Sequence, residues 1–267
     1  MSVARILIVA GSDSGGGAGI QADIKTVTLL GGHAMTAITA ITAQNTLGVT
    51  DVHAIPADSV IAQIDAVASD IGVDAVKIGM IGSPDTASRV AERLCRPDLA
   101  DVPVVFDPVM IATSGSRLAS AETIAVFGEL MRRATLSTPN LDELGALAGL
   151  ALSDEASVAA AAGGVIERLG CSAILATGAE LRAAELTDLL FDGGGAMAKH
   201  RWSAERIDTI HDHGTGCTLA SAVATGLGQG MALDAAIERA RRFVRSALEH
   251  APGLGRGHGP MGHRALA

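Results

Sequence analysis

Two glycines and a cysteine stand in a short turn, Gly214-Thr215-Gly216-Cys217, directly before an apolar run that predicts a helix. Glycines allow consecutive amide N–H groups to point at one spot, and the start of a helix adds the positive end of its dipole. Such a turn can hold a phosphate or the charge on a phosphoryl group in transfer. We therefore expect Gly214, Thr215, Gly216 and Cys217 to be catalytic residues.

Cys217 would lie in the first turn of that helix, where the dipole favours the thiolate and lowers the pKa of the thiol. Such a cysteine could act as a general base or as a partner for a substrate hydroxyl. The alternative is a small buried cysteine without a chemical role, which is the usual case for an isolated cysteine. The flanking glycines favour the functional interpretation.

A second glycine-rich segment, residues 11–19, follows an expected strand and precedes an expected helix. It lacks the Gly-Lys-Ser/Thr ending of a P-loop. It also fails the dinucleotide spacing G-x-G-x-x-G, because Ile20 or Ala22 stands where the last glycine is needed. Four glycines within five residues exceed what one tight turn requires, so we favour a ligand-binding loop over a simple turn.

Polar side chains follow several apolar runs. Asp107 ends one run, and a carboxylate there is costly to bury and often functional. Gln44 follows another run and could read the hydrogen-bonding groups of a heterocycle, although a turn or cap residue is the more common role. Asn140 and Glu143 have the spacing of a capping box, and a carboxylate there could also orient water-bound Mg²⁺ near phosphates.

The elements that must position these residues alternate along the chain. Strands are predicted at residues 6–10, 34–43, 75–78, 102–106, 135–138 and 173–176. Helices are predicted at residues 18–30, 58–70, 120–133, 140–149, 154–169, 216–228 and 232–249, and another helix should begin at Ser83-Pro84-Asp85. Residues 185–202 predict a β-hairpin with its turn at Gly193-Gly194-Gly195, and the tail from residue 252 predicts a loop.

This alternation predicts a parallel sheet covered by helices on both faces. We expect one α/β domain over residues 1–267, with three α/β/α layers, a mostly parallel central sheet and a small late β-hairpin. In such sheets ligands bind beyond the carboxyl ends of the strands. That rule brings the segment 11–19, Gln44, Met80, Asp107 and Gly178 to one rim.

Composition excludes several classes of function. The formal net charge is −9 and aromatic residues make up 2% of the chain, so a nucleic-acid partner is not expected. The apolar stretch near the N-terminus ends at Gly11, too soon for a membrane span, so no membrane association is expected. Three separated cysteines favour reduced thiols and a cytoplasmic protein. His258 and His263 lack metal-ligand spacing and receive no role.

Several motifs, taken in order, resemble bacterial hydroxymethylpyrimidine/phosphomethylpyrimidine kinases of the ribokinase-like superfamily. The motifs are Ala10-Gly11-Ser12-Asp13, Gly16-Gly17-Ala18-Gly19-Ile20-Gln21-Ala22-Asp23, Ala43-Gln44-Asn45-Thr46, Lys77-Ile78-Gly79-Met80, Asp107-Pro108-Val109-Met110, Thr138-Pro139-Asn140, His213-Gly214-Thr215-Gly216-Cys217-Thr218 and Gly257-His258-Gly259-Pro260. The likeness covers nearly the whole chain, and the first block paired with the Gly-Thr-Gly-Cys block is quite specific.

This resemblance implies a thiamine-biosynthesis enzyme that uses ATP and Mg²⁺. It would phosphorylate 4-amino-5-hydroxymethyl-2-methylpyrimidine and then the resulting monophosphate, and a homodimer is expected. The implied pyrimidine-binding residues are Gln44, Asp23, Gly11, Met80 and Val109. The residues expected to contact ATP or its phosphates are Lys77, Asp107, Asn140, Glu143, Thr177 and Gly178, with Glu143 holding the metal through water.

The sequence departs from the family pattern at two places. Thr177 stands where the family usually has a lysine, so a cation near the phosphates is missing. Ser116 replaces a family aspartate. The nearest alternative is a vitamin B6 kinase of the same fold that acts on pyridoxal. A catalytically idle ligand-binding module is a further alternative. A sugar kinase is less favoured, because those enzymes usually keep an aspartate at the place of Cys217.

Overall fold

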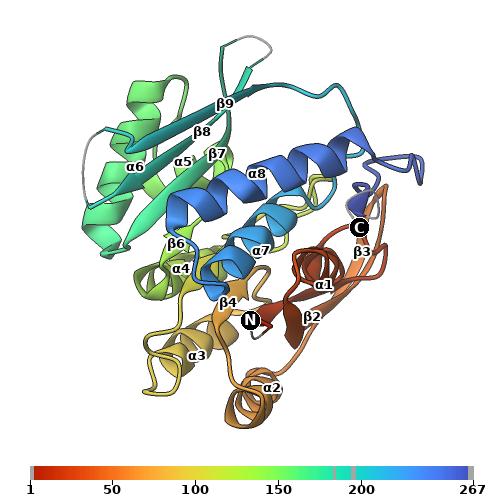
Figure 1. Ribbon diagram of the computed structural model, residues 1–267, viewed down its shortest axis with the longest axis vertical. Coiled ribbons are helices and arrows are strands. Elements are labelled where there is room, and N and C mark those ends of the chain that lie inside the picture. Colours follow the sequence, from red (N-terminus) through yellow and green to blue (C-terminus); the bar gives the residue numbers. More distant parts are fainter. Residues whose placement is uncertain (1–2, 183–184, 194–196, 264–267) are drawn as a thin grey trace.

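The computed structural model describes residues 3–182, 185–193 and 197–263. Within them one sheet has the strand order β3-β2-β1-β4-β5-β6-β7-β8-β9 (Figure 1). The strands are β1 (Arg5–Asp13), β2 (His33–Asn45), β3 (Gly48–Ala54), β4 (Ala75–Ile78), β5 (Val104–Phe106), β6 (Leu136–Ser137), β7 (Ala173–Arg182), β8 (Glu185–Asp192) and β9 (His200–Glu205).

The centre of the sheet is parallel, and both edges are antiparallel. Strands β2, β1, β4, β5, β6 and β7 pair in parallel, while β3, β8 and β9 run antiparallel to their neighbours. The expected mostly parallel sheet and late hairpin are therefore confirmed. Gly193 follows β8, whereas Gly194 and Gly195 of the expected turn lie outside the described residues.

Two strand predictions need correction. The segment Gly48–Ala54 received no prediction, because β3 is an edge strand with mostly exposed side chains and carries no apolar run. The second strand of the hairpin, expected to end at Trp202, instead spans His200–Glu205. The position of β9 is set by its pairing with β8, in which His200 lies opposite Leu190, more than by its own apolar residues.

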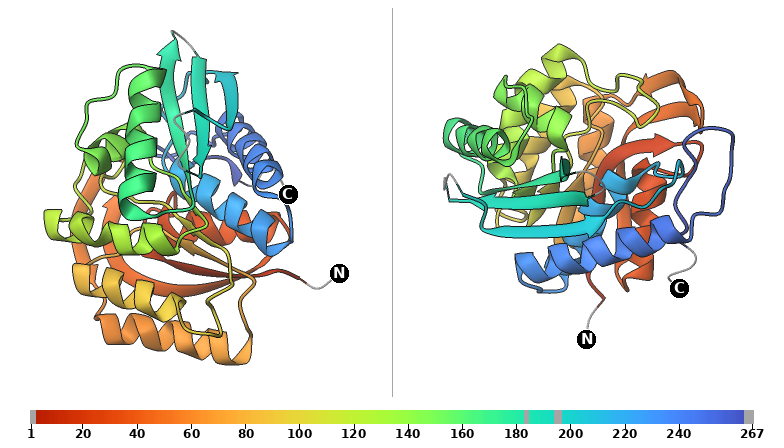
Figure 2. Two further views of the ribbon diagram at one scale, coloured as in Figure 1. Left: turned by 90° about the vertical axis from the view of Figure 1, so that its left-hand side faces the viewer. Right: turned by 90° about the horizontal axis from the view of Figure 1, so that it is seen from above.

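Helices cover both faces of the sheet (Figure 2). Helices α1 (Gly19–Leu29), α7 (Thr215–Gly228) and α8 (Leu233–Glu249) pack on one face. The other face carries α2 (Ala57–Asp70), α3 (Pro84–Leu94), α4 (Ala121–Arg133), α5 (Leu141–Ala148) and α6 (Glu155–Leu169). The Ser83 signal acts as expected, since its hydroxyl accepts a hydrogen bond from the Thr86 amide at 3.1 Å.

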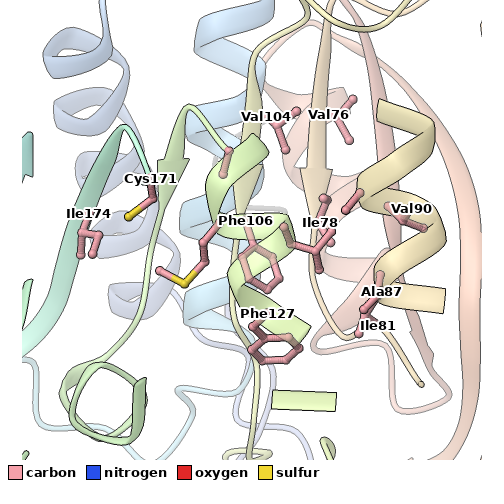
Figure 3. Packing of buried hydrophobic residues seen from close by; sticks show 14 of the residues in the cluster. Val76, Ile78, Ile81, Ala87, Val90, Val104, Phe106, Phe127, Cys171 and Ile174 are labelled. Atoms are coloured by element: carbon pink, nitrogen blue, oxygen red, sulfur yellow. The ribbon is translucent and has the colours of Figure 1, made fainter. Parts of the chain in front are cut away.

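The core between the sheet and helices α2–α6 consists mainly of aliphatic side chains around a single aromatic pair (Figure 3). Phe106 of β5 and Phe127 of α4 meet edge to face, with ring centroids 5.2 Å apart. On the opposite face, small residues such as Ala220 and Ala224 let α7 lie close to the sheet. This close packing fixes the start of α7 above the ends of the parallel strands.

The last described residues return to the rim of the sheet. The Gly262 amide donates to the Ala247 carbonyl at 2.8 Å, and the His213 amide donates to the Gly259 carbonyl at 3.2 Å. The expected loop from residue 252 is therefore docked beside the Gly-Thr-Gly-Cys turn. None of the helices in the described ranges combines the length and apolarity needed to cross a membrane.

Candidate active site

A cavity of about 520 Å³ opens at the carboxyl ends of the parallel strands. We call it the first cavity. Its wall includes Gly11, Gln44, Met80, Asp107, Val109, Asn140, Glu143, Thr177, Gly214, Thr215, Gly216 and Cys217. Most residues that the sequence predicted for one site thus meet around one space, as the rule for ligands in open α/β sheets requires.

The two glycine-rich segments touch each other at the edge of this cavity. Gly214 has φ +89°, a conformation that strongly favours glycine. A Cβ atom at Gly214 would also overlap the carbonyl oxygen of Gly17. Two independent reasons therefore require glycine at position 214: the positive backbone angle and the close approach of the glycine-rich segment at residues 11–19.

The turn itself leaves donors free for an anion. Residues at the start of a helix have no intrahelical partner for their amides. The first helical hydrogen bond here runs from the Thr218 amide to the Gly214 carbonyl at 2.9 Å. The Gly216 and Cys217 amides precede it in α7, at the positive end of the helix dipole. Both amides therefore lie at a helix start, where an anion is favoured, and anion binding there stays a prediction.

The carboxylate of Asp13 organises the loop at residues 14–18. It accepts hydrogen bonds from the amides of Gly15, Gly17 and Ala18 at 2.8–2.9 Å. It also accepts one from His213 Nε2 at 3.0 Å. Burial pushes the pKa of Asp13 upward, but these hydrogen bonds outweigh burial and hold it below its ordinary value. These three loop amides thus donate to a carboxylate of the protein itself.

Asp23 and Lys77 lie beneath the cavity and line neither its wall nor that of the second cavity described below. Both side chains are fully buried, and Lys77 Nζ contacts the two Asp23 oxygens at 3.0 and 2.9 Å. Ser221 donates a further hydrogen bond to Asp23 at 2.6 Å. These positions correct the expectation that Asp23 contacts the pyrimidine and Lys77 contacts ATP, because each side chain is committed to the other.

Lys77 still acts on the cavity through its charge. Burial disfavours that charge, but the carboxylate of Asp23, with Cys217 and Asp107 nearby, raises the pKa of Lys77 above its ordinary value. Asp23 therefore favours the charged form of Lys77, and the two side chains form a buried ion pair. The field of Lys77 stabilises negative charge that develops on the neighbouring cavity wall.

Cys217 differs from the expectation. Burial raises the pKa of its thiol to about 12, although Lys77 acts in the opposite direction. The expected lowering by the helix dipole is therefore wrong for this cysteine, because removal of the thiol from water outweighs it. Cys217 is a neutral thiol at physiological pH.

Asp107 and Glu143, which line the first cavity, carry carboxyl groups with raised pKa values. Burial raises the pKa of Asp107 to about 6, and burial with the nearby Asp107 charge raises that of Glu143 to about 8. Glu143 also closes a capping box, since it accepts from the Asn140 amide at 3.0 Å while Asn140 accepts from the Glu143 amide at 2.9 Å. The structural interpretation of this pair is confirmed.

The same carboxyl groups suit a hard cation. Asp107 Oδ2 is buried and has no hydrogen-bond partner among the residues that the structure describes, so it has an unused acceptor site. In the part of the chain described, no three His, Cys, Asp or Glu side chains are grouped closely enough to form a metal site on their own. This donor set fits Mg²⁺, which often keeps most of its waters and takes few protein ligands.

A second cavity of about 460 Å³ lies on the other side of the turn, beside β8, β9 and α8. Thr177, Thr215 and Gly216 line both cavities. Gly178 lines only the second, where its amide donates to Asp188 at 2.8 Å. The turn therefore stands between two spaces, each large enough for a small ligand.

The wall of the second cavity carries basic residues that the sequence analysis missed: Arg241, Arg242 and Arg245 of α8. Arg241 pairs with Asp188 at 2.6 Å and lies 6.0 Å from the ring centre of Trp202. His200 stacks on that indole with ring centres 5.4 Å apart. The signal was available, because the arginines recur at helical spacing opposite the apolar stripe of α8.

Gln44 and His213 form another part of the first cavity. Gln44 contacts His213 Nε2 at 3.2 Å, and His213 is only 8% exposed. The sequence analysis assigned no role to His213 or Asp13. No local pattern could have linked them, since they lie 200 residues apart in the chain.

Comparisons with known proteins agree on one family. The phosphomethylpyrimidine kinase family matches residues 13–262. The hydroxymethylpyrimidine/phosphomethylpyrimidine kinase of Mycobacterium bovis is 44% identical over 98% of this chain and 94% of its own length. The thiamine biosynthesis bifunctional protein ThiED of Geobacter sulfurreducens is 48% identical over 97% of this chain, which spans 52% of that longer protein.

Solved structures share the fold. The ADP complex of Bacillus subtilis pyridoxal kinase superimposes with a TM-score of 0.87 at 33% identity, covering 99% of both chains. The phosphomethylpyrimidine kinase of Clostridium difficile superimposes with a TM-score of 0.78 at 33% identity, covering 92% of this chain and 99% of that one. The ribokinase-like α/β fold expected from the sequence is thereby confirmed.

The buried ion pair predicts strong coupling between its two members. Lys77→Met should lower the free energy of unfolding by about 3–5 kcal/mol, because it leaves the Asp23 carboxylate buried without its counter-ion. Adding Asp23→Leu should recover much of this loss, so the double variant should be more stable than Lys77→Met alone. Urea unfolding of the wild type, both single variants and the double variant measures the coupling. Additive losses would show that the pair is not a unit.

The raised pKa of the Cys217 thiol predicts slow alkylation with a steep pH dependence. In a Cys95→Ser/Cys171→Ser background only Cys217 can react. The rate of Cys217 alkylation by iodoacetamide should rise about tenfold per pH unit from pH 7 to pH 10. Only the thiolate reacts, and below the pKa the thiolate fraction increases about tenfold with each pH unit. A variant that keeps only the exposed Cys95 provides the comparison. A plateau below pH 9 would refute the raised pKa.

Proposed function

The chain belongs to the phosphomethylpyrimidine kinase family, and we propose that it transfers phosphoryl groups from ATP to 4-amino-5-hydroxymethyl-2-methylpyrimidine and then to the monophosphate, in thiamine biosynthesis. The observation that carries this proposal is the position of the Gly214–Cys217 turn. Thr215 and Gly216 line both cavities, so two ligands can meet at one set of anion-binding amides. A phosphoryl donor and an acceptor require that arrangement.

We assign the pyrimidine to the first cavity. Gln44 supplies an amide that can pair with a nitrogen heterocycle, and Gly11, Met80 and Val109 give the surrounding wall. Met80 is almost fully buried. Its sulfur packs so close to Gly11 that a Cβ atom on Gly11 would lie only 3.0 Å from it. This part of the cavity wall is therefore tightly packed. A flat six-membered ring suits such a narrow space.

We assign ATP to the second cavity. Three arginines of α8 line this cavity, and each is paired with a carboxylate: Arg241 with Asp188, Arg242 with Glu238 and Arg245 with Glu249. A phosphate is an alternative partner for such a guanidinium, and the family lysine is absent at Thr177. Asn140, Thr177 and Gly178 would lie along the phosphates, because Thr177 borders both cavities and Gly178 borders the second. A bound ADP in the structurally similar Bacillus subtilis pyridoxal kinase supports nucleotide binding by this fold.

The transfer step depends on charge stabilisation more than on base strength. Phosphoryl transfer passes through a loose transition state in which little covalent work falls to the protein. The Gly216 and Cys217 amides and the buried Lys77 cation stabilise the developing charge. Because Cys217 is a neutral thiol, we assign it to positioning the substrate hydroxyl rather than to removing its proton in the resting enzyme.

Mg²⁺ belongs to the same proposal. When bound with ATP, it neutralises phosphate charge. Asp107 and Glu143 line the first cavity, and Glu143 would act through water. Glu143 must lose a proton to carry charge near neutral pH, because its pKa is raised to about 8.

We propose that residues 1–267 work as one kinase domain, because both cavities draw on segments from across the chain. A cytoplasmic location follows from the same reaction, since ATP and reduced thiols are found there, and the three cysteines are free. No nucleic acid or membrane is required as a partner. A homodimer stays a prediction, and sedimentation velocity measures it directly.

The proposed function predicts turnover with two pyrimidines. ADP release should be observed with Mg-ATP and either the hydroxymethylpyrimidine or its monophosphate, each with a higher kcat/KM than pyridoxal. Gln44→Ala should raise KM for the pyrimidine about tenfold or more while leaving KM for ATP unchanged, because it removes a hydrogen-bonding group from the first cavity alone. Gln229→Ala, at the end of α7, provides the control. Preference for pyridoxal would favour the vitamin B6 kinase, and no ADP release would favour a binding module.

The metal assignment predicts a specific effect of Glu143→Gln. Glutamine can keep the capping box through its oxygen, loses the long hydrogen bond from the Met110 amide at 3.3 Å, and cannot become charged. The fold should therefore persist while the Mg²⁺ concentration for half-maximal rate rises about tenfold. Asp154→Asn makes the matched change at the capping box of α6, away from both cavities, and should leave that concentration unchanged. Equal Mg²⁺ requirements for Glu143→Gln and wild type would exclude Glu143 from metal binding.

A further inference from the structure

Four polar side chains form a network along one side of the first cavity. His213 Nε2 lies 3.0 Å from Asp13 Oδ2 and 3.2 Å from the amide end of Gln44. The other end of the same amide lies 3.0 Å from Thr42 Oγ1, and Thr42 Oγ1 lies 3.0 Å from the Ser12 carbonyl oxygen. The direction of each hydrogen bond in this network can be worked out from its neighbours.

The proton on His213 is fixed by Asp13. A carboxylate only accepts hydrogen bonds, and Asp13 is already the acceptor for three backbone amides. His213 Nε2 must therefore carry a hydrogen and donate it. This holds for the neutral ring and for the charged ring, because Nε2 is protonated in both.

The hydroxyl of Thr42 is fixed in the same way. A hydroxyl has one hydrogen to donate, and the Ser12 carbonyl can only accept it. Thr42 Oγ1 is then left as an acceptor toward Gln44. Gln44 Nε2 lies 3.2 Å from His213 Nε2 and Gln44 Oε1 lies 3.0 Å from Thr42 Oγ1, which sets donor against donor at His213. The two ends of an amide have nearly the same shape, so the hydrogen bonds decide between them and require the reversed amide, with its nitrogen beside Thr42 and its oxygen beside His213. The one hydrogen on His213 Nε2 is then shared between Asp13 and the Gln44 oxygen. The two neighbours, from different parts of the chain, require the same orientation.

We propose that His213 is a positioning residue that sets substrate specificity by holding the Gln44 amide in this one orientation. The inference rests on the proposed function, because it concerns the heterocycle that Gln44 meets. An aminopyrimidine presents an amino donor beside a ring-nitrogen acceptor. A primary amide pairs with both groups, as glutamine does with adenine, but only when its oxygen and nitrogen stand in the matching order.

The ring of His213 is held firmly enough to do this. Its backbone amide donates to the Gly259 carbonyl at 3.2 Å, and its Nδ1 lies 3.4 Å from Thr113 Oγ1. A Cβ at Gly17 would clash with the imidazole and contact Pro260 at 3.3 Å, so the ring is packed between the glycine loop and the docked tail. The orientation of Gln44 thus depends on segments from both ends of the chain.

Two variants of His213 test this role. Glutamine can place its amide nitrogen near the position of Nε2, whereas the shorter asparagine reaches only the region of Nδ1. We expect His213→Gln to bind the aminopyrimidine within about threefold of wild type and His213→Asn to bind it about 10–100-fold more weakly, as for loss of a buried hydrogen bond to a polar partner. Isothermal calorimetry without nucleotide measures both.

A reversed ligand gives the readout that a structural defect would not produce. In 4-oxo-5-hydroxymethyl-2-methylpyrimidine, a ring N–H donor stands beside a carbonyl acceptor, which is the opposite order. Wild type and His213→Gln should prefer the amino compound strongly, while in His213→Asn the freed amide can turn and the ratio of the two dissociation constants should fall about tenfold or more. Equal ratios in His213→Gln and His213→Asn would overturn the proposal.

A second pair of variants covers the case in which substitutions at His213 prevent folding. Thr42→Ser keeps the hydroxyl acceptor and should keep the ratio, whereas Thr42→Val removes it and should lower the ratio. Equal ratios in this pair would also overturn the proposal. If the wild type binds neither pyrimidine, the proposed function itself fails. If it discriminates and both pairs of variants do so equally, only the role of His213 fails.

Discussion

The contact between Gly17 and Gly214 is the constraint on which the site depends. Because neither residue carries a side chain, the glycine loop after β1 and the turn before α7 approach until no room is left for a single additional carbon. That approach brings Asp13 and His213 into hydrogen-bonding distance. It also sets the wall of the first cavity opposite the amides of the turn. One steric requirement therefore links substrate recognition to anion binding across most of the chain.

Electrostatics in the floor of the site follow from burial more than from helix dipoles. A thiol in the first turn of a helix would ordinarily ionise more easily, yet burial among neighbouring groups raises the pKa of Cys217 instead. The same burial keeps Lys77 and Asp23 bound to each other and raises the pKa of Asp107 and Glu143. The floor of the site therefore holds a compensated ion pair beside two carboxyl groups that take up protons more readily than usual.

Local patterns predicted the central strands, most helices and the rim where ligands bind, because each signal lies within a few neighbouring residues. Ser83 and the Asn140–Glu143 pair acted as helix caps for that reason. Burial, in contrast, is a property of the folded chain. Asp23 and Lys77 were expected to contact ligands, since nothing in their sequence neighbourhood shows that they face each other. The edge strand β3 escaped prediction because pairing with β2, rather than a buried apolar run, defines it.

The second cavity contains Trp202, the only tryptophan of a chain that has no tyrosine. Its indole is stacked on His200 and lies near the Arg241 guanidinium, so its surroundings change when a ligand displaces water or moves that cation. Intrinsic fluorescence of this protein thus originates at one place, without the tyrosine background of most proteins. The emission of the native molecule is a built-in optical reporter of occupancy in that cavity, and it leaves the first cavity unlabelled.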